Sequence, residues 1–322
     1  MSKIGIADNC GLKFSKDIKE YWEKKGHEVR FERGASQFIA QWADLYYFDW
    51  SDNNIHYIMN LYNGKDTDPQ HFTPDWDPNK KPKIVVRAID WDVWIGHARS
   101  QELVNFVDQW ICIAPHIERK LRAEAEYFPV SKLKLIRPGV NLDRFTLKTK
   151  ETDGYQIGMV LGDMWWYKNH MGGLDIFYEL AKDDPKWHLH IRGQHESGEY
   201  NKVMYDHFIE SRGLKDRVTL YDHVEDMNDW YENIDILLHP GMKETFCYAV
   251  GEAMAKGIRP VINNFYGAED IWPREYLYNH GGEAIHKILA GEEKPKEEYR
   301  KHIEDNYNIV RMMKEFDELL GT

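Results

Sequence analysis

The clearest pattern in the sequence is a regular alternation of short apolar runs with segments whose apolar residues recur at helical spacing. The runs predict buried strands at 3–7, 45–48, 84–89 and 110–114, and again at 156–161, 187–191, 218–221 and 234–238. Helical spacing predicts helices at 15–25, 170–181, 201–211 and 227–233. This alternation is typical of an α/β fold with doubly wound parallel sheets.

The last of these strands leads into the most informative stretch, residues 239–257. Phe246, Ala249, Val250 and Ala253 recur at helical spacing, which predicts a helix starting near Thr245. Such a helix would direct its unpaired N–H groups at the carboxyl edge of the sheet, where an anion such as a diphosphate can bind.

Two glutamates bracket this predicted helix. Glu244 stands at its start, and Glu252 follows eight residues later, about 12 Å along a helix axis and about 80° around it. Two carboxylates in these positions could contact two parts of one extended ligand. The competing interpretation is an ordinary surface helix with a glutamate near each end.

Together with Ala253-Met254-Ala255-Lys256-Gly257, the two glutamates resemble the Glu-x7-Glu signature of retaining glycosyltransferases of the GT-B fold, family 4 in particular. The resemblance implies two Rossmann-like domains with doubly wound parallel sheets, facing a central cleft. It also implies a nucleotide-sugar donor. The flanking strand and the run Pro260-Val261-Ile262 favour this interpretation over the plain surface helix.

The stretch from Ile136 to Phe145 resembles the Pro-Asn-Gly-Val-Asp-x-x-x-Phe linker between the two domains of that family. It predicts an acceptor-binding domain at 1–140 and a nucleotide-sugar-binding domain at 141–295. The segment 296–322 has apolar residues at helical spacing, and the resemblance implies a terminal helix that crosses back to the first domain.

The resemblance implies that Lys168 stabilises the departing diphosphate, because it takes the lysine position of a Gly-Arg-x4-Lys motif that begins at Gly162. Asp163 stands at the arginine position, which leaves half of the diphosphate clamp unfilled. Three basic residues could replace that arginine, and the sequence does not choose among them: Arg87, Arg192 and Lys243.

The remaining donor contacts also follow from the resemblance. Glu244 would hold hydroxyls of the donor sugar, and Glu252 would accept hydrogen bonds from the ribose. The other implied donor-binding positions are the first loop at Gly11, the backbone of Thr245, Phe246 and Cys247 along the phosphates, and His223 and Val224 beside the base. The family commonly has Glu-Gly-Phe-Gly where this chain has Glu-Thr-Phe-Cys, so we expect a narrower choice of sugar.

Asp90 and His97 are the candidate acceptor residues of the first domain. They follow a predicted strand and are interleaved with tryptophans, and this combination suits sugar hydroxyls and an acceptor nucleophile. The competing interpretation for both is a structural role. Asp-x-Asp, a metal motif of another glycosyltransferase fold, occurs at 75–77 and 90–92. Three residues are weak evidence against the motifs of the second half, so we expect no obligatory metal and no other cofactor.

Composition narrows the class of protein. A chain of 322 residues with 42% hydrophobic and 30% charged residues is typical of a soluble globular protein of two domains. Without a long apolar stretch or a signal peptide, we expect a cytoplasmic protein, or one in the host cytoplasm if it is viral. Cys10, Cys112 and Cys247 have neither disulfide-framework nor zinc-site spacing.

The net charge of −12 belongs to residues 141–322, because residues 1–140 have equal numbers of basic and acidic side chains. An acidic chain argues against tight non-specific binding of nucleic acid. The neutral first half still leaves room for a local basic patch, with candidates at 80–83 and 119–122.

The sequence therefore predicts a retaining glycosyltransferase that moves a sugar from a nucleotide sugar to a hydroxyl acceptor. The acceptor could be a glycan, a lipid-linked precursor, or a hydroxymethylated base in duplex DNA, as in viral DNA-modifying transferases. The alternative is a nucleotide-sugar-binding protein of the same fold with reduced catalysis. A nicotinamide enzyme is disfavoured, because no Gly-x-Gly-x-x-Gly follows the first strand of either half.

Overall fold

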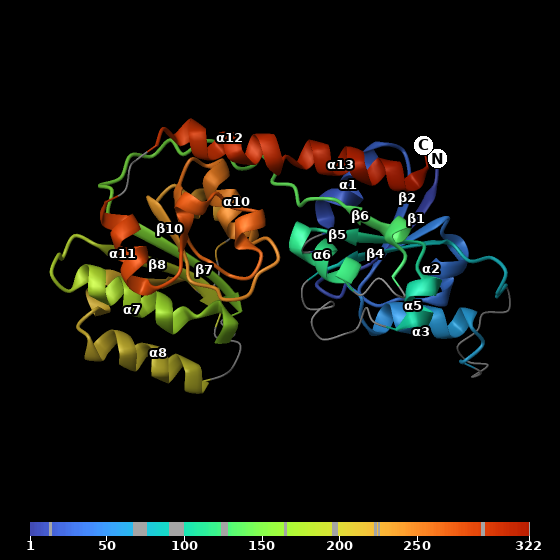
Figure 1. The fold of residues 1–322 in the computed structure, drawn as a ribbon, viewed down its shortest axis with the longest axis horizontal. Coiled ribbons are helices and arrows are strands. Elements are labelled where there is room, and N and C mark those ends of the chain that lie inside the picture. The colour runs from blue at the N-terminus through green and yellow to red at the C-terminus, as the bar shows by residue number, and fades with distance from the viewer. Residues whose placement is uncertain are drawn as a thin grey trace. The chain divides into compact units, whose positions relative to one another are not determined.

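The computed structural model describes residues 1–12, 15–66, 76–89, 100–123, 128–163, 166–194, 199–221, 224, 226–290 and 294–321 (Figure 1). The chain divides into two compact units. Unit 1 comprises Met1–Arg137 with Val310–Thr322, and unit 2 comprises Pro138–Ile309. Each unit is a parallel sheet covered by helices.

The sheet of unit 1 has the strand order β2-β1-β3-β4-β5-β6, and all neighbouring strands are parallel. Its strands are β1 (Lys3–Ala7), β2 (Glu28–Glu32), β3 (Leu45–Phe48), β4 (Lys83–Ala88), β5 (Gln109–Cys112) and β6 (Leu133–Leu135). The central strands are buried almost throughout, which explains why they stand out in the sequence as continuous apolar runs.

The helices of unit 1 are α1 (Lys16–Lys24), α2 (Gln37–Trp42), α3 (Asn53–Tyr62), α5 (Gln101–Phe106) and α6 (Pro115–Ala123), and the C-terminal α13 (Ile309–Asp317) packs on the same unit. Several begin where their sequence supplies a cap. The side chains of Ser36, Asp52 and Ser100 each accept a backbone N–H from the first turn of the helix that follows.

The C-terminal segment is two helices rather than one. After α12 (Lys296–Asn306) the chain extends for two residues, and α13 begins at Ile309. At the interruption the N–H of Val140 donates to the carbonyl of Tyr307 at 2.7 Å, and the N–H of Ile309 donates back to Val140 at 3.2 Å. Backbone pairing with Val140 therefore accounts for a break that helical spacing alone does not reveal.

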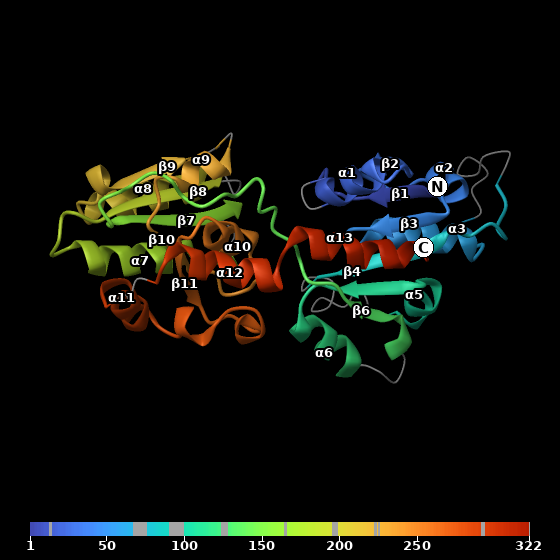
Figure 2. The ribbon, with the colours of Figure 1, turned by 90° about the horizontal axis from the view of Figure 1, so that it is seen from above.

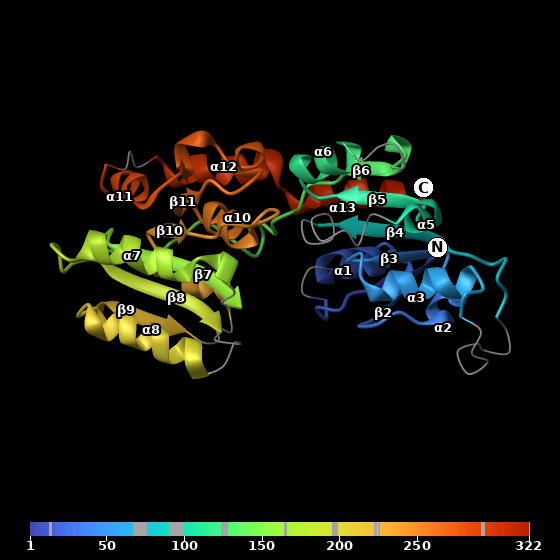
Figure 3. The same cartoon turned by 60° about the horizontal axis from the view of Figure 1, so that its bottom comes forward.

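The sheet of unit 2 is also parallel, with the order β12-β11-β10-β7-β8-β9 (Figure 3). Its strands are β7 (Gln156–Asp163), β8 (His188–Gln194), β9 (Val218–Tyr221), β10 (Ile236–His239), β11 (Arg259–Asn263) and β12 (Leu277–Tyr278). Order along the chain reverses between β7 and β10, and this is the kind of position where open α/β sheets bind ligands.

Helices cover both faces of this sheet (Figure 2). They are α7 (His170–Ala181), α8 (Glu199–Ser211), α9 (Met227–Tyr231), α10 (Tyr248–Ala255), α11 (Gly281–Leu289) and α12. Apolar residues of α7, α8 and α11 share one core with β7, β8 and β10. On the other face Gly158 leaves room for Trp230 and Ile234, since a Cβ there would lie 2.9 Å from both side chains.

The predicted fold class is confirmed, because both units are Rossmann-like parallel sheets of six strands in the described residues. The central cleft between domains stays a prediction. No helix in the described ranges is both long and apolar enough to cross a membrane.

Candidate functional site

The loop between β10 and α10 forms the centre of the candidate site. The predicted helix start near Thr245 was wrong, because α10 begins at Tyr248. Cys247 precedes it in the left-handed region with φ of 65°, a conformation that no regular helix continues through. Glu244 therefore lies in the loop, and the spacing expected for two glutamates on one helix does not apply.

Neighbouring loops hold this loop in place. The N–H of Met242 donates to the carbonyl of Tyr167 at 2.8 Å, which ties it to the loop after β7. The Asn169 amide donates to the Pro240 carbonyl at 3.2 Å, and the Asn263 amide donates to the Gly241 carbonyl at 3.1 Å. Loops that follow β7, β10 and β11 thus meet at the carboxyl edge of the sheet.

Two of the predicted catalytic residues meet here. The Lys168 ammonium forms an ion pair with Oε1 of Glu244, and the side chains are only 22% and 12% exposed. Burial disfavours the charged form of Lys168, but the Glu244 carboxylate outweighs it and raises the pKa of Lys168. Lys168 therefore remains charged in the absence of ligand.

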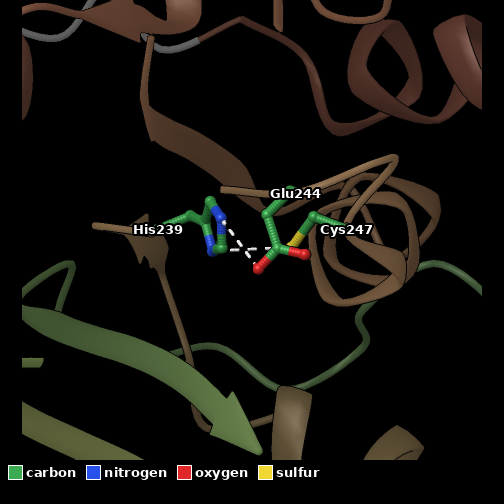
Figure 4. Close-up of side chains that lie close together, drawn as sticks. All are labelled: His239, Glu244 and Cys247. Atoms are coloured by element: carbon green, nitrogen blue, oxygen red, sulfur yellow. Dashed lines mark hydrogen bonds and ion pairs between the residues drawn. The ribbon is translucent and has the colours of Figure 1, made fainter. Parts of the chain in front are cut away.

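His239, the last residue of β10, lies against the same carboxylate (Figure 4). Its side chain is 3% exposed, with Nε2 3.6 Å from Oε1 of Glu244 and Nδ1 3.4 Å from Sγ of Cys247. Burial and the charge of Lys168 lower the pKa of His239 to about 3, so the ring is neutral. Gly241 makes room for it, since a Cβ there would lie 2.8 Å from Nε2.

Glu252 lies within α10 and has a different environment. Its Oε2 accepts a hydrogen bond from the Tyr231 hydroxyl at 3.1 Å. Burial raises the pKa of Glu252 to about 7, although Tyr231, Arg144 and Arg192 act in the opposite direction. This carboxyl therefore changes charge near neutral pH.

The three residues between Glu244 and α10 are largely buried. Thr245 is 8% exposed, and the Phe246 ring packs 5.1 Å from that of Trp272 and 4.8 Å from that of Tyr307. Burial and the Glu244 charge raise the pKa of the Cys247 thiol, so it stays protonated. Side chains that the family pattern lacks at 245 and 247 are thus accommodated inside the protein.

Four other predicted donor residues lie in unit 2. Gly162 has φ of 61° at an irregularity in the pairing of β7 with β8. The Arg192 Nε is buried and makes no hydrogen bond to the described part of the chain, and its charge acts on Glu252. The Lys243 ammonium lies 5.9 Å from the centre of the Tyr167 ring, and Val224 is half-buried.

Some predicted residues belong elsewhere or lie outside the described residues. Asp90, His97 and His223 lie outside the described residues. Gly11 lies in unit 1 with φ of 70°. Arg87, a suggested replacement for the missing arginine, is also in unit 1, where its guanidinium pairs with buried Asp49 at 2.8 Å.

Two residues that contact the predicted glutamates, His239 and Tyr231, were not predicted as site residues from the sequence. His239 directly follows a predicted strand, so its position at the carboxyl edge was the signal that could have identified it. Tyr231 had no such signal, because an aromatic residue in a short helix most often serves the core.

The residues of this site lie within a region that matches a known protein family. Residues 145–306, half of the sequence, match the family model of the glycosyl transferases group 1. The chain belongs to this family. A curated relative of this group 1 member is the protein CapJ of Staphylococcus aureus, 22% identical over 138 residues. That match covers 43% of the chain and only 35% of CapJ.

Solved structures extend the likeness of this group 1 member to both units. Sucrose-phosphate synthase from Thermosynechococcus elongatus aligns with a TM-score of 0.75 at 14% identity, over 99% of this chain and 98% of that one. HepE of Anabaena, in complex with UDP-glucose, also gives 0.75 at 14% identity over 100% of both chains. Likenesses at such identity show the fold alone, and they confirm the predicted GT-B fold.

Proposed function

We propose that this protein is a retaining glycosyltransferase that transfers a sugar from a nucleotide sugar to a hydroxyl acceptor. The observation that carries the proposal is the ion pair of Lys168 with Glu244, 76 residues apart in sequence, beside the start of α10. A cation, a carboxylate and a helix N-terminus in one place match the needs of a donor that has a diphosphate and a sugar.

In this proposal the diphosphate binds between Lys168 and the amino end of α10. Negative charge grows on the leaving oxygen during transfer, and the Lys168 ammonium stabilises it. The lysine supplies the positive charge that a metal ion supplies in other enzymes, so we propose catalysis without a metal. Transfer that stops in EDTA and returns with a divalent cation would contradict this step.

The carboxylates hold the two ends of the donor. Glu244, released from Lys168 by the diphosphate, accepts hydrogen bonds from hydroxyls of the sugar. Glu252 accepts from the ribose. Because the HepE structure of the same fold holds UDP-glucose, uridine diphosphate sugars are the first donors to test.

We further propose that the anomeric configuration is retained. The departing phosphate would assist attack on the face that it leaves, and this route needs no protein nucleophile. The anomeric coupling constant of the product, measured by proton NMR, tests the proposal directly. An inverted product would overturn it.

For the acceptor we propose a glycan rather than duplex DNA or a lipid-linked precursor. Trp166, two residues before Lys168, is 73% exposed, and an exposed indole suits the apolar face of a sugar ring. The net charge of −12 disfavours DNA. Asp90 and His97 remain our candidates for orienting the acceptor hydroxyl. Salt-dependent retention on duplex DNA would point to the modified base instead.

The central test compares Glu244 with a glutamate outside the candidate site. Glu244→Gln removes the proposed sugar contact, whereas Glu297→Gln removes an exposed carboxylate from α12. A thermal-shift screen identifies the nucleotide sugar that stabilises the wild type. We then expect slow donor hydrolysis by the wild type and Glu297→Gln, and at least a tenfold loss, roughly one lost charged hydrogen bond, in Glu244→Gln. Donor binding with no turnover by any form, with any acceptor, would favour the catalytically reduced binding protein.

A further inference from the structure

The two ring nitrogens of His239 are directed at two different side chains. Nδ1 lies 3.4 Å from Sγ of Cys247, and Nε2 lies 3.6 Å from Oε1 of Glu244 (Figure 4). The ring is buried, and Nε2 makes no hydrogen bond within the described part of the chain. A buried, unpaired polar atom aimed at a carboxylate calls for an explanation.

We propose that Cys247 and His239 form a hydrogen-bond relay that orients Glu244 for the donor sugar. The Cys247 S–H donates to Nδ1 of His239, and the Nε2–H of His239 points to Oε1 of Glu244. No proton is transferred, and both are positioning residues. The inference rests on the proposed role of Glu244 in holding the donor.

The direction of the relay follows from the groups at its ends. The Cys247 thiol is protonated, because burial raises its pKa, and can donate. If Nδ1 carried the proton instead, the Nε2 lone pair would face the Glu244 carboxylate, and two acceptors would repel each other. A doubly protonated ring is excluded by burial and by the nearby Lys168 charge.

The relay becomes important when a donor binds. A distance of 3.6 Å is longer than a hydrogen bond, and Lys168 currently neutralises the same oxygen of Glu244. A diphosphate competes for the Lys168 ammonium, and the Glu244 carboxylate, whose side chain is 12% exposed, then loses this cation. The Nε2–H of His239 is already in place, and such contacts commonly shorten only in the substrate complex.

The backbone at Cys247 supports a role for its side chain. Cys247 is one of few residues other than glycine with positive φ in the described chain, a conformation that favours glycine. A side chain held in this conformation is strained, and strain of this kind collects at functional sites. Here the strained residue places its sulfur on His239.

A metal site is the competing interpretation, since ligand atoms of His239, Glu244 and Cys247 lie within 4.8 Å of one another. One ion can bind only one nitrogen of an imidazole, whereas here each nitrogen faces a different partner. The Lys168 ammonium, a cation, already pairs with Oε1 of Glu244. The contacts therefore favour the relay.

The first test reads the tautomer of His239 from its imidazole 15N shifts by NMR, with the resonance assigned from its loss in His239→Gln. We expect a neutral Nε2–H ring in the wild type and in Cys247→Ser, which keeps a donor. In Cys247→Gly, which relieves the backbone strain but removes the donor, we expect a mixture of tautomers. A wild-type Nδ1–H ring, or a Zn²⁺ titration that shifts the resonance at equimolar metal, would overturn the relay.

The second test compares two variants with amide side chains, His239→Gln and His239→Asn, to separate an effect on the position of Glu244 from an effect on folding. In His239→Gln the side-chain amide reaches the place of Nε2 and can donate to Glu244, whereas in His239→Asn it reaches only that of Nδ1. We expect kcat for transfer within about threefold of wild type for Gln and lower by roughly tenfold to a hundredfold for Asn, the worth of one charged hydrogen bond. Equal kcat for both variants in forms that melt like the wild type would refute the relay. The proposed function would then still stand if Glu244→Gln is inactive, and it fails separately if Glu244→Gln is fully active.

Discussion

At the scale of single residues, the ion pair of Lys168 with Glu244 allows stability and the proposed transfer to be tested with the same variants. Both side chains are largely buried, so removing one leaves the other as an uncompensated charge. We expect Lys168→Met to lower the free energy of unfolding by about 1–3 kcal/mol and to abolish transfer. Urea unfolding measures the first effect, and a donor-hydrolysis assay measures the second.

The double variant Lys168→Met with Glu244→Gln is the matched control. It removes both charges, so we expect most of the lost stability to return while transfer stays absent. If the double variant is as unstable as the sum of the two single variants, the ion pair does not couple them and this prediction is wrong.

Glu252 makes the free energy of unfolding of the protein depend on pH. Burial raises its pKa from 4.5 to about 7 in the folded protein, so the folded state binds the proton more tightly than the unfolded chain. The stabilising contribution is complete below pH of about 4.5 and is lost as pH rises through about 7. We expect Glu252→Gln to lose less stability than the wild type between pH 5 and pH 8, by about 1–3 kcal/mol.

Melting temperatures across that pH range provide the measurement. Glu297→Gln, which removes an exposed carboxylate, should follow the wild-type curve. Parallel curves for the wild type and Glu252→Gln would mean that the Glu252 carboxyl is already ionised in the folded state.

The sequence motifs predict Lys168 and Glu244 as residues of the candidate site, but they do not predict the contact between His239 and Cys247. The positions of Lys168 and Glu244 follow from motifs, and the structure brings the two side chains together. The contact of His239 with Cys247 was not predictable, because it depends on the left-handed backbone at 247, which propensity assigns to glycine.

At the scale of elements, boundaries were predicted best where the residue pattern within one segment is clear. β1, β3, β9 and α7 have the predicted bounds, because apolar and β-branched residues mark the three strands and a helical repeat marks α7. The α10 start and the break between α12 and α13 were missed. The break depends on backbone pairing with Val140, and the α10 start follows the left-handed backbone of Cys247. The apolar periodicity of a single segment reveals neither.

The end of α10 depends on a fully buried lysine. The Lys256 ammonium pairs with Glu232 just after α9 and donates to the Asn228 side chain at 2.8 Å. We expect Lys256→Met to destabilise the protein by about 3 kcal/mol, because Glu232 loses its cation. Lys301→Met, which removes an exposed lysine from α12, should cost about 0.5 kcal/mol or less.

Stability at acidic pH tests whether the lost ion pair with Glu232 is the reason that Lys256→Met is less stable. Burial alone would raise the pKa of Glu232, but hydrogen bonds from Lys256 and from two backbone N–H groups lower it to about 2. Its contribution is therefore present above pH of about 4.5 and is lost as pH falls toward 2. In Lys256→Met, the free energy of unfolding measured in urea should fall less between pH 7 and pH 3 than it does in the wild type. An equal fall in the two proteins would exclude Glu232 as the affected group.

At the scale of the whole molecule, the sequence indicated the fold class because two sets of alternating strands and helices flank the Pro138-Gly139 stretch. The structural division falls between Arg137 and Pro138. Close packing explains why residue 139 is a glycine, since a Cβ on Gly139 would lie 2.4 Å from the Cα of Ile309. The linker and the segment before α13 therefore run side by side.

The C-terminal residues complete the core of unit 1. The Phe316 side chain, 2% exposed on α13, packs with ring centres 6.0 Å from Trp22 and 5.8 Å from Tyr47. The Tyr21 hydroxyl donates to Asp317 at 2.6 Å beside it. We expect Phe316→Ala to destabilise unit 1 by about 3–5 kcal/mol, because the ring leaves a cavity between α1 and β3.

Hydrogen–deuterium exchange can locate this loss within the molecule. Amides of β1 and β3 should exchange faster in Phe316→Ala, whereas those of β10 and β11, in unit 2, should keep the wild-type rate. Val310→Ala removes a side chain that is 55% exposed on the same helix and should leave both sets unchanged. Equal acceleration in both units would mean that they unfold as one, and the terminal helix would then stabilise the donor site as well as its own core.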